Sequence, residues 1–420
     1  MTQTAAARVT EQEIPLEALA PAAPWRSRPA ASLALMLFAL LVSRLLEQIP
    51  VPGIDPAGFR HLLEEDPYGR FAILRRSLSL GALGVRPYAA AWILVQLVAV
   101  AMPARAGSAR ADLSRYTLVL TSVLAMVQSY GMAVAIEALP GSPVVIDPGL
   151  GFRLVACLTM TACTLFLAWL GERITARGLA NGVLSIILGD IVTGLPNAGV
   201  DLFTLARVGV IPDATIIRYV IVVLVTVAGV VCVERARYRF VVQYPKREVA
   251  GTIYGGERAS IQIRCNGPGI VPAFIAGWLV PAAFAFDPSG GGWRGAGQPI
   301  AAIGPLQFLS YFSLFVLSAL LLSAAPANPA VLAEAIRKRG GFIPGIRPGP
   351  NTATHLRRIG IALCLPSAAA LALLSVLPWL SVTGALFPPS LAGSGIVIVA
   401  IILLDTLSRF RAGAWRAAEE

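Results

Sequence analysis

The sequence is poor in the residues from which most active sites are built. Its 420 residues include two histidines, His61 and His355, which lie far apart in the chain, and no G-x-S-x-G or phosphate-binding-loop motif. Neither a zinc-type site nor histidine-based catalysis has enough parts. Nucleotide hydrolysis by this chain lacks its usual motif. We therefore expect a protein that is not an enzyme and that uses no metal or cofactor.

Cysteine is also scarce, and its distribution argues against a redox or metal site. No C-x-x-C pair occurs. Four of the five cysteines fall in apolar runs and the fifth in a polar stretch: Cys157, Cys163, Cys232, Cys364 and, in the polar stretch, Cys265. This placement favours small buried hydrophobic side chains over disulfides or ligands.

Charged residues make up 14% of the chain and hydrophobic ones 56%. Soluble domains carry roughly a quarter charged residues, so this composition indicates a membrane protein. Apolar runs near the ~20 residues that cross a bilayer as a helix recur along nearly the whole length. The sequence predicts an all-α, multi-pass protein with ten transmembrane helices, over about 29–49, 80–102, 116–136, 151–170, 183–200, 215–233, 268–286, 305–325, 359–380 and 391–408.

The net charge of +11 is explained by where the positive charges fall. Alternate connections between the apolar runs hold most of the arginines and lysines. The connections between them are poor in basic residues, because 137–150 contains only two acids and 381–390 contains no charge. By the positive-inside rule, both termini are cytoplasmic. Because membrane topology explains the positive charge, the charge predicts no DNA partner.

The first apolar run is followed by no signal-cleavage motif and is interpreted as a retained helix.

Two cytoplasmic connections, 234–267 and 326–358, are longer than the others, and long ordered loops often carry function. In the first, residues 239–244 and 259–264 alternate apolar and polar side chains, as paired strands do. This pattern predicts a β-hairpin that extends into the cytoplasm.

The second connection contains "PAVLAEAIRKRGG", which predicts a short helix that stops at the glycine pair. The segment "FIPGIRPG" follows, with Pro344 and Pro348 on either side of Arg347. Proline fixes φ, so this segment loses little entropy when it binds a partner. We predict that Arg347 is a presented group. An ordinary basic loop would explain the charge but not the paired prolines.

The stretch 50–79 begins with "IPVPGIDP", and the apolar run after it contains Pro87. A helix broken by proline at membrane depth is tolerated where it lines a cavity. Lining of a pore and a simple kinked helix both remain open interpretations. Ionisable residues in or near the spans are few, and no pair of carboxylates lies at mid-membrane. A secondary transporter of small solutes is therefore the less favoured alternative function.

Between about 40 and 408 the chain carries, in this order, the motifs "IPVPGID", "LGVRPYAAA", "GERITARGLANG", "TGLPN", "VERARYRFVVQYPKR", "GIVPAF", "FIPGIRPG" and "LLDT". In these motifs and their order, the chain resembles the SecY family of protein-conducting channels. The resemblance implies two five-helix halves of inverted topology, 29–200 and 201–408, between a cytoplasmic N-terminal segment, 1–28, and a cytoplasmic tail, 409–420. It also implies a plug half-helix near 57–76 and a lateral gate between the second and seventh helices.

The resemblance further implies a function and its residues. Unfolded secretory polypeptides would cross the bacterial inner membrane through an apolar ring, and apolar signal sequences would leave sideways into the lipid bilayer. By position against the motifs, the ring is Val85, Ala89, Ile187, Phe274 and Ile398. A SecA-type ATPase or a ribosome would supply the energy by docking on Arg347, Lys246, Arg247, Arg337, Lys338 and Arg339. Small SecE-like and SecG-like membrane subunits are the expected partners.

Some residues depart from the family's pattern at these functional places. The tip of the first long connection has Gly251 and Thr252 where the family usually carries arginines. Arg86 directly follows a ring position, and Ala89 is small for a ring side chain. A charge at that depth is costly unless it faces water or a partner. These departures suggest, as an alternative, a specialised or degenerate accessory channel that serves few clients.

Overall fold

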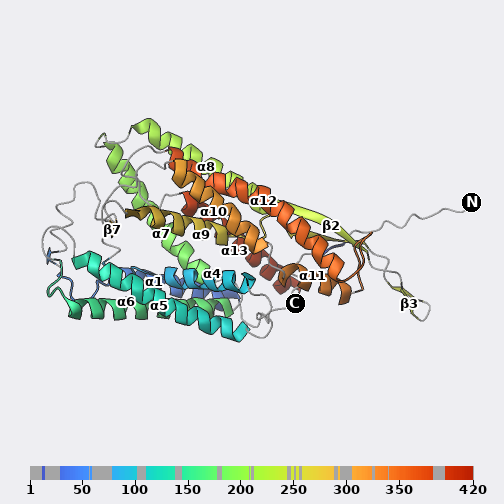
Figure 1. The fold of residues 1–420 in the computed structure, drawn as a ribbon, viewed down its shortest axis with the longest axis horizontal. Coiled ribbons are helices and arrows are strands. Elements are labelled where there is room, and N and C mark those ends of the chain that lie inside the picture. The colour runs from blue at the N-terminus through green and yellow to red at the C-terminus, as the bar shows by residue number, and fades with distance from the viewer. Residues whose placement is uncertain are drawn as a thin grey trace, which may run out of the picture.

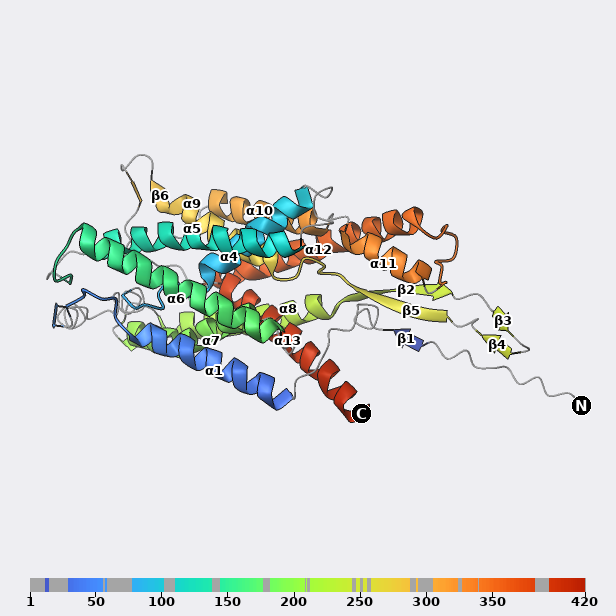
Figure 2. The same cartoon turned by 90° about the horizontal axis from the view of Figure 1, so that it is seen from below.

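The structure is a computed structural model and is mostly helical (Figure 1). It describes residues 12–14, 29–55, 57–58, 78–101, 110–137, 144–176, 182–207, 209, 212–243, 247–249, 252–254, 258–287, 292–293, 305–323, 327–338, 340–381 and 393–419. Most of the long helices run roughly along the longest dimension of the molecule, and a narrow β-ribbon extends from one end of them (Figures 1 and 2).

The long helices pack in two groups that follow each other in the chain. The first group is α1 (Pro29–Gln48), α4 (Arg86–Ala101), α5 (Arg110–Glu137), α6 (Leu150–Ala176) and α7 (Gly182–Arg207). The second is α8 (Asp213–Arg235), α9 (Val271–Ala285), α10 (Pro305–Ser323), α12 (Pro350–Ser381) and α13 (Gly393–Glu419). Within the first, α5 lies against α4 and α6; within the second, α12 lies against α8 and α10. The groups meet mainly where α7 contacts α13.

In the part of the chain that the structure describes, five helices are long and apolar enough to cross a membrane. They are Ser114–Glu137, Leu150–Ala176, Ala214–Arg235, Leu306–Ser323 and Pro350–Pro378. Large apolar side chains on their outer faces are exposed; Val127, Leu158 and Leu224, for example, are each more than 60% exposed. Lipid can cover such a face without cost, whereas water cannot.

Helix α4 begins later than the apolar run 80–102 predicts. Residues 80–85 are not helical; they are hydrogen-bonded to the end of α1, with Leu80 N–H donating to Ile49 O at 2.9 Å and Gly81 N–H to Leu46 O at 3.0 Å. The helix starts at Arg86, so Pro87 lies in its first turn, where a missing N–H group breaks no helical hydrogen bond. Pro87 therefore starts this helix and does not kink it.

Several other helices extend beyond their apolar runs. Helix α7 continues past 200, the expected boundary between halves, to Arg207; α12 begins at Pro350, before 359; and α13 continues through the expected tail, 409–420, as far as Glu419. Hydropathy finds the part of a helix that lipid can cover, whereas backbone hydrogen bonds continue into polar ends that water can solvate.

The ribbon is built on β2 (Arg237–Gln243) and β5 (Arg258–Arg264), which are antiparallel with Phe240 opposite Ile261. The alternating pattern predicts paired strands at this place. Beyond them, β3 (Arg247–Val249) pairs with β4 (Thr252–Tyr254). A strand that the sequence did not predict, β1 (Gln12–Ile14), lies parallel to β5. Its three residues are too few to show a period of two. A short pair, β6 (Phe286–Asp287) and β7 (Gly292–Trp293), follows α9.

Candidate functional site

The five predicted ring residues lie in one apolar cluster at the meeting of the two helix groups. Each is at most 6% exposed. They come from both groups: Val85 directly before α4, Ala89 in α4, Ile187 in α7, Phe274 in α9 and Ile398 in α13. The fold thus brings together side chains that are up to about three hundred residues apart in sequence. Such a surface makes no directional bonds, so it does not select among the side chains that contact it.

Close backbone contacts hold Phe274 and Ile398 in this cluster. Gly277, one turn after Phe274, packs so near α13 that an added Cβ would lie 3.2 Å from the Ser394 side chain. At Gly393, the first residue of α13, an added Cβ would lie 1.8 Å from the Ser375 carbonyl oxygen of α12. Glycine permits both approaches because it has no side chain.

A partly buried ion pair borders the cluster beside Val85 and Ile187. Asp190, one turn after Ile187, is 6% exposed, and its Oδ1 accepts hydrogen bonds from Ser43 Oγ at 3.3 Å and Arg44 Nη2 at 3.2 Å. Its Oδ2 lies against Gly84, whose φ of +54° suits glycine. In the sequence Arg44 and Asp190 are two charged residues of separate apolar runs, and the structure pairs them.

Arg86 lies outside this buried cluster, although it directly follows Val85. Its side chain is exposed, whereas Val85 is fully buried. Val85 lies in the turn before α4 and Arg86 is the first helical residue, and their different exposure shows that the two side chains face different surroundings. The chain therefore avoids the cost of burying this charge among apolar side chains.

A second assembly joins the two long connections. Gln243, at the end of β2, and Phe342 exchange two backbone hydrogen bonds, each 2.9 Å. Side chains from the ribbon, α11 (Ala327–Lys338) and α12 form one buried cluster beneath this bridge: Phe240, Val242, Ile261, Ala333, Ile336, Ile343 and Leu356. The connections therefore form a single surface, which no local pattern in either segment predicts.

Helix α11 ends at the glycine pair, which confirms the predicted stop. Gly340 has φ of +75°, its N–H donates to Arg337 O at 2.9 Å, and Gly341 N–H donates to Ile336 O at 2.9 Å. These two bonds are those of a Schellman motif, in which a left-handed residue ends the helix. The chain turns here toward Phe342 and the ribbon.

Arg347 has an exposed side chain on a restrained backbone. Before it, Ile346 N–H donates to Ile343 O at 3.1 Å, and Gly345 adopts φ of +82°. After it, the Thr352 hydroxyl donates to the Arg347 carbonyl oxygen at 3.2 Å. This geometry agrees with the prediction of a presented guanidinium group, because the turn is held on both sides while the side chain is solvated.

The remaining predicted docking residues are described only in part. Arg337 and Lys338 are exposed at the end of α11, whereas Lys246, Arg339 and the side chain of Arg247 lie outside the described residues. Of the predicted plug, 57–76, only residues 57 and 58 are described. There the Asp55 carboxylate accepts the N–H groups of both residues, at 3.0 and 3.1 Å, as the cap of a helical turn does.

Arg337 is already engaged with an acid of its own helix. Its Nε and Nη2 donate to the two carboxylate oxygens of Glu334 at 2.9 and 2.8 Å. These hydrogen bonds lower the pKa of Glu334. Because that pKa is lower in the folded state, the stabilisation is present at neutral pH and is lost as the pH falls through the folded value. The charge of Lys338, which is exposed at the end of α11, adds to the lowering of the Glu334 pKa.

The base of the ribbon is tied to three helices. Asn266 is 4% exposed, and its Nδ2 donates to Glu234 at the end of α8 and to the Gly269 carbonyl oxygen, which precedes α9. Arg264, the last residue of β5, pairs with Asp405 of α13 at 3.4 Å. The base of the ribbon is therefore in contact with α8, with the residue before α9 and with α13, and α9 and α13 carry Phe274 and Ile398.

Comparison with known proteins places this geometry in context. The family model described as SecY matches residues 79–407. Protein translocase subunit SecY of Rickettsia bellii is 32% identical over 403 residues, covering 89% of this chain and 91% of that protein. The protein of the same name from Escherichia coli K12 is 33% identical over 392 residues, covering 88% of each.

Solved structures show the same fold at 15% sequence identity. A SecY structure whose plug domain is described as stabilising the closed state of the translocation channel aligns with a TM-score of 0.65, over 90% of this chain and 92% of that one. Sec61 in the canine ribosome-channel complex aligns with a TM-score of 0.56 over the same shares. The two-group packing of the long helices is therefore a known channel fold.

Proposed function

The chain belongs to the SecY family, and on that premise we propose that it is the channel subunit through which unfolded secretory polypeptides cross a bacterial inner membrane. The observation that carries this proposal is the apolar cluster of Val85, Ala89, Ile187, Phe274 and Ile398. These side chains meet between two helix groups, where a separation of the groups would open a passage lined by them.

The physical properties of that cluster suit polypeptide conduction. A narrow apolar constriction holds too little water to conduct ions. It also forms no hydrogen bonds that would retain a passing side chain, so sequences of any kind can slide through. Apolar signal sequences gain free energy when they move sideways into lipid, at roughly 25 cal/mol per Å² of apolar surface removed from water. One opening then serves both secretion and release into the membrane.

For the architecture we assign ten spans in two inverted halves, a plug within 57–76, a gate between α4 and α9, and a cytoplasmic hairpin built on β2 and β5. Each of the ten predicted apolar runs contains one long helix, which supports the count of spans. The alternation of basic connections supports cytoplasmic termini and a cytoplasmic ribbon. The contacts of α7 with α13 support a hinge between the halves at that place.

We assign the energy source to a partner, a SecA-type ATPase or a ribosome, that docks on the joined cytoplasmic connections. The exposed Arg347 on its restrained turn supports this assignment, with Lys338 and Arg337 nearby on α11. Lys246, Arg247 and Arg339 belong to the same proposed surface by sequence position. SecE-like and SecG-like subunits are the proposed membrane partners, as for a family member.

Cross-linking of a trapped client tests the proposal. The five native cysteines are replaced by alanine, and a single cysteine is placed at Val85 or Ile187, or, as the control, at Leu224, which is 65% exposed on the outer face of α8. A secretory polypeptide that carries a cysteine and is arrested during transport by a folded C-terminal domain should, after addition of an oxidant, form disulfides with positions 85 and 187 and not with 224. Cross-links at 224 alone would show that clients do not pass through the cluster.

A further inference from the structure

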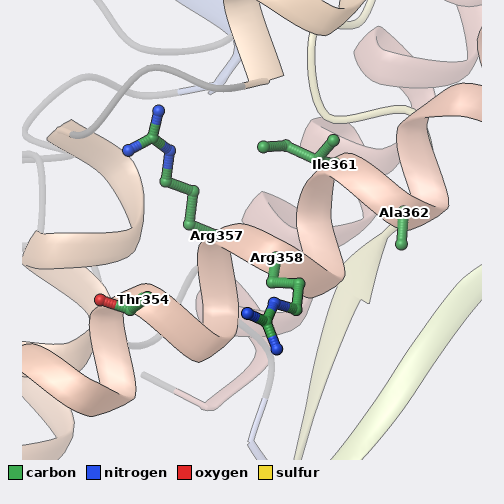
Figure 3. A pocket seen from close by; sticks show the side chains of 5 residues that line it. All are labelled: Thr354, Arg357, Arg358, Ile361 and Ala362. Atoms are coloured by element: carbon green, nitrogen blue, oxygen red, sulfur yellow. The ribbon is translucent and has the colours of Figure 1, made fainter.

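Charged side chains near the start of α12 contrast with those at the end of α1. Arg357 and Arg358 line an open groove of about 400 Å³ on α12, and their exposed guanidinium groups leave the helix in different directions (Figure 3). Because they diverge, they form no common binding site. The polar side chains at the end of α1, in contrast, converge on one carboxylate.

That carboxylate is Asp190 of α7. Arg44 Nη2 donates to its Oδ1 at 3.2 Å, and the Ser43 hydroxyl donates to the same oxygen at 3.3 Å. Arg44 also pairs with Glu47, one turn along α1. The Asp190 side chain is 7% exposed. A carboxylate buried to that extent is stable only where it is paired and hydrogen-bonded, so these contacts fix its position.

The two helices that carry this ion pair approach each other closely. At Gly189, next to Asp190, an added Cβ would lie 2.3 Å from the Leu40 side chain of α1. Glycine permits this approach because it has no side chain. The ion pair therefore joins helices that are already packed together, and it has little freedom to rearrange.

The end of α1 also holds the residues that lead to Val85. The Gly81 N–H group donates to a carbonyl oxygen in the last turn of α1 at 3.0 Å. At Gly84, an added Cβ would lie 3.2 Å from Asp190 Oδ2. Val85 directly follows Gly84, and Ile187 lies one turn before Asp190 in α7. The carboxylate thus lies between the backbone positions of two ring residues.

We propose that Asp190 is a positioning residue for the apolar cluster. Its Oδ1 is tied to α1 and its Oδ2 supports the backbone at Gly84, so one carboxylate sets the position of Val85 relative to Ile187. Ionisable residues in apolar helices often mark an ion path, but a carboxylate already bonded to a guanidinium and a hydroxyl group has little left to offer a passing ion. This role rests on the proposed function, in which Val85 and Ile187 line the constriction.

Cross-linking within the purified full chain tests the positioning role. The five native cysteines are replaced by alanine, Val85→Cys and Ile187→Cys are introduced, and the two thiols are joined by a short membrane-permeant bismaleimide. The yield is measured relative to labelling by N-ethylmaleimide. We expect Asp190→Asn and Arg44→Gln each to lower the yield on the order of tenfold, the factor for about 1.4 kcal/mol, because hydrogen bonds to charged groups contribute at least that much.

The double variant separates a shared contact from two independent effects. Arg44→Gln with Asp190→Asn should lower the yield no further than the stronger single change, because both changes remove the same interaction. Losses that multiply in the double variant would contradict the proposal. An unchanged yield in a folded Asp190→Asn chain would contradict it as well.

The matched control breaks an ion pair elsewhere in the same helix group. Glu137 of α5 accepts a hydrogen bond from Arg153 Nε of α6 at 2.7 Å. Glu137→Gln with Arg153→Gln should leave the yield within about twofold, since distant sites act independently. An equal loss in this control would reduce the effect to general stability and overturn the proposal. Client cross-links at position 224 alone would overturn polypeptide conduction and leave this yield unchanged, so the two proposals fail separately.

Discussion

At the scale of single residues, exposed arginines with the same charge differ in the hydrogen bonds of their guanidinium groups and in how their backbone is held. Arg337 donates two hydrogen bonds to Glu334 and so adds little net charge to its surface. Arg347 sits on a turn held by Thr352 and by the Ile343–Ile346 hydrogen bond, with its side chain in water. Because the turn is already ordered, docking on Arg347 costs little backbone entropy. This is why we propose Arg347 as the main docking residue for a partner.

Reversal of this charge should stop partner-driven transport without unfolding the chain. We expect Arg347→Glu to lower the rate of motor-dependent transport into membrane vesicles at least tenfold, since a loss of about 1.4 kcal/mol in docking free energy already gives that factor. Arg115→Glu, at an exposed arginine near the start of α5, is the control and should keep the rate. An Arg347→Glu protein that transports at the original rate contradicts the proposed docking surface.

At the scale of elements, glycines set how closely the helices around the cluster approach one another. Gly277 brings α9 against α13, and Gly393 brings the start of α13 against the backbone of α12. The neighbour at Gly393 is a carbonyl oxygen, which cannot move aside as a flexible side chain can. The packing of α13, and with it the position of Ile398, therefore depends on this residue.

A single methyl group at Gly393 should separate α12 from α13. We expect Gly393→Ala to lower the free energy of unfolding by about 1–3 kcal/mol, the usual cost of overpacking. Gly360→Ala is the control, because its added Cβ has no neighbour closer than 3.9 Å, and alanine is favoured over glycine within a helix by about 1 kcal/mol. Unfolding in detergent, followed by circular dichroism, gives both values. A midpoint for Gly393→Ala at or above that of Gly360→Ala would contradict the contact.

At the scale of the whole molecule, two helix groups share one apolar cluster, and the ribbon is linked to the helices around it. Asn266 connects the base of the ribbon to α8 and to the residues before α9, and Arg264 connects it to α13. We propose that a docked partner acts on Phe274 and Ile398 through these contacts, so that the proposed seal and its opening involve both helix groups.

The seal depends on the cluster being apolar. Val85→Thr replaces a methyl group by a hydroxyl group, and Ile187→Thr and Ile398→Thr each replace an ethyl group by a hydroxyl group. Together they let water enter the constriction. We expect ion conductance across planar bilayers to rise on the order of tenfold, the factor for about 1.4 kcal/mol off the barrier. The same three changes at Leu158, Leu224 and Leu309, which are at least 60% exposed on outer faces, should have no effect. An unchanged conductance in the first variant would place the seal elsewhere.

Sequence alone determined where the apolar runs lie and which segments are unusual. The runs predicted the long helices because burial in lipid requires about 20 apolar residues whatever the neighbours are. The glycine pair at 340–341 predicted the end of α11, because a left-handed residue there is a local requirement. The order of the motifs identified the family, and through it the five residues of the cluster.

Tertiary structure decided what depends on contacts between distant segments. Three features depend on contacts between segments that are far apart in the chain. They are the start of α4 at Arg86, the pairing of Arg44 with Asp190 and the backbone bridge from Gln243 to Phe342. The hydrophobic periodicity of a sequence does not reveal such contacts, because each of the two segments fits its own local pattern whether or not the other segment is present. Packing alone brings them together, since a buried polar or close-packed group gains free energy only when its complement is present.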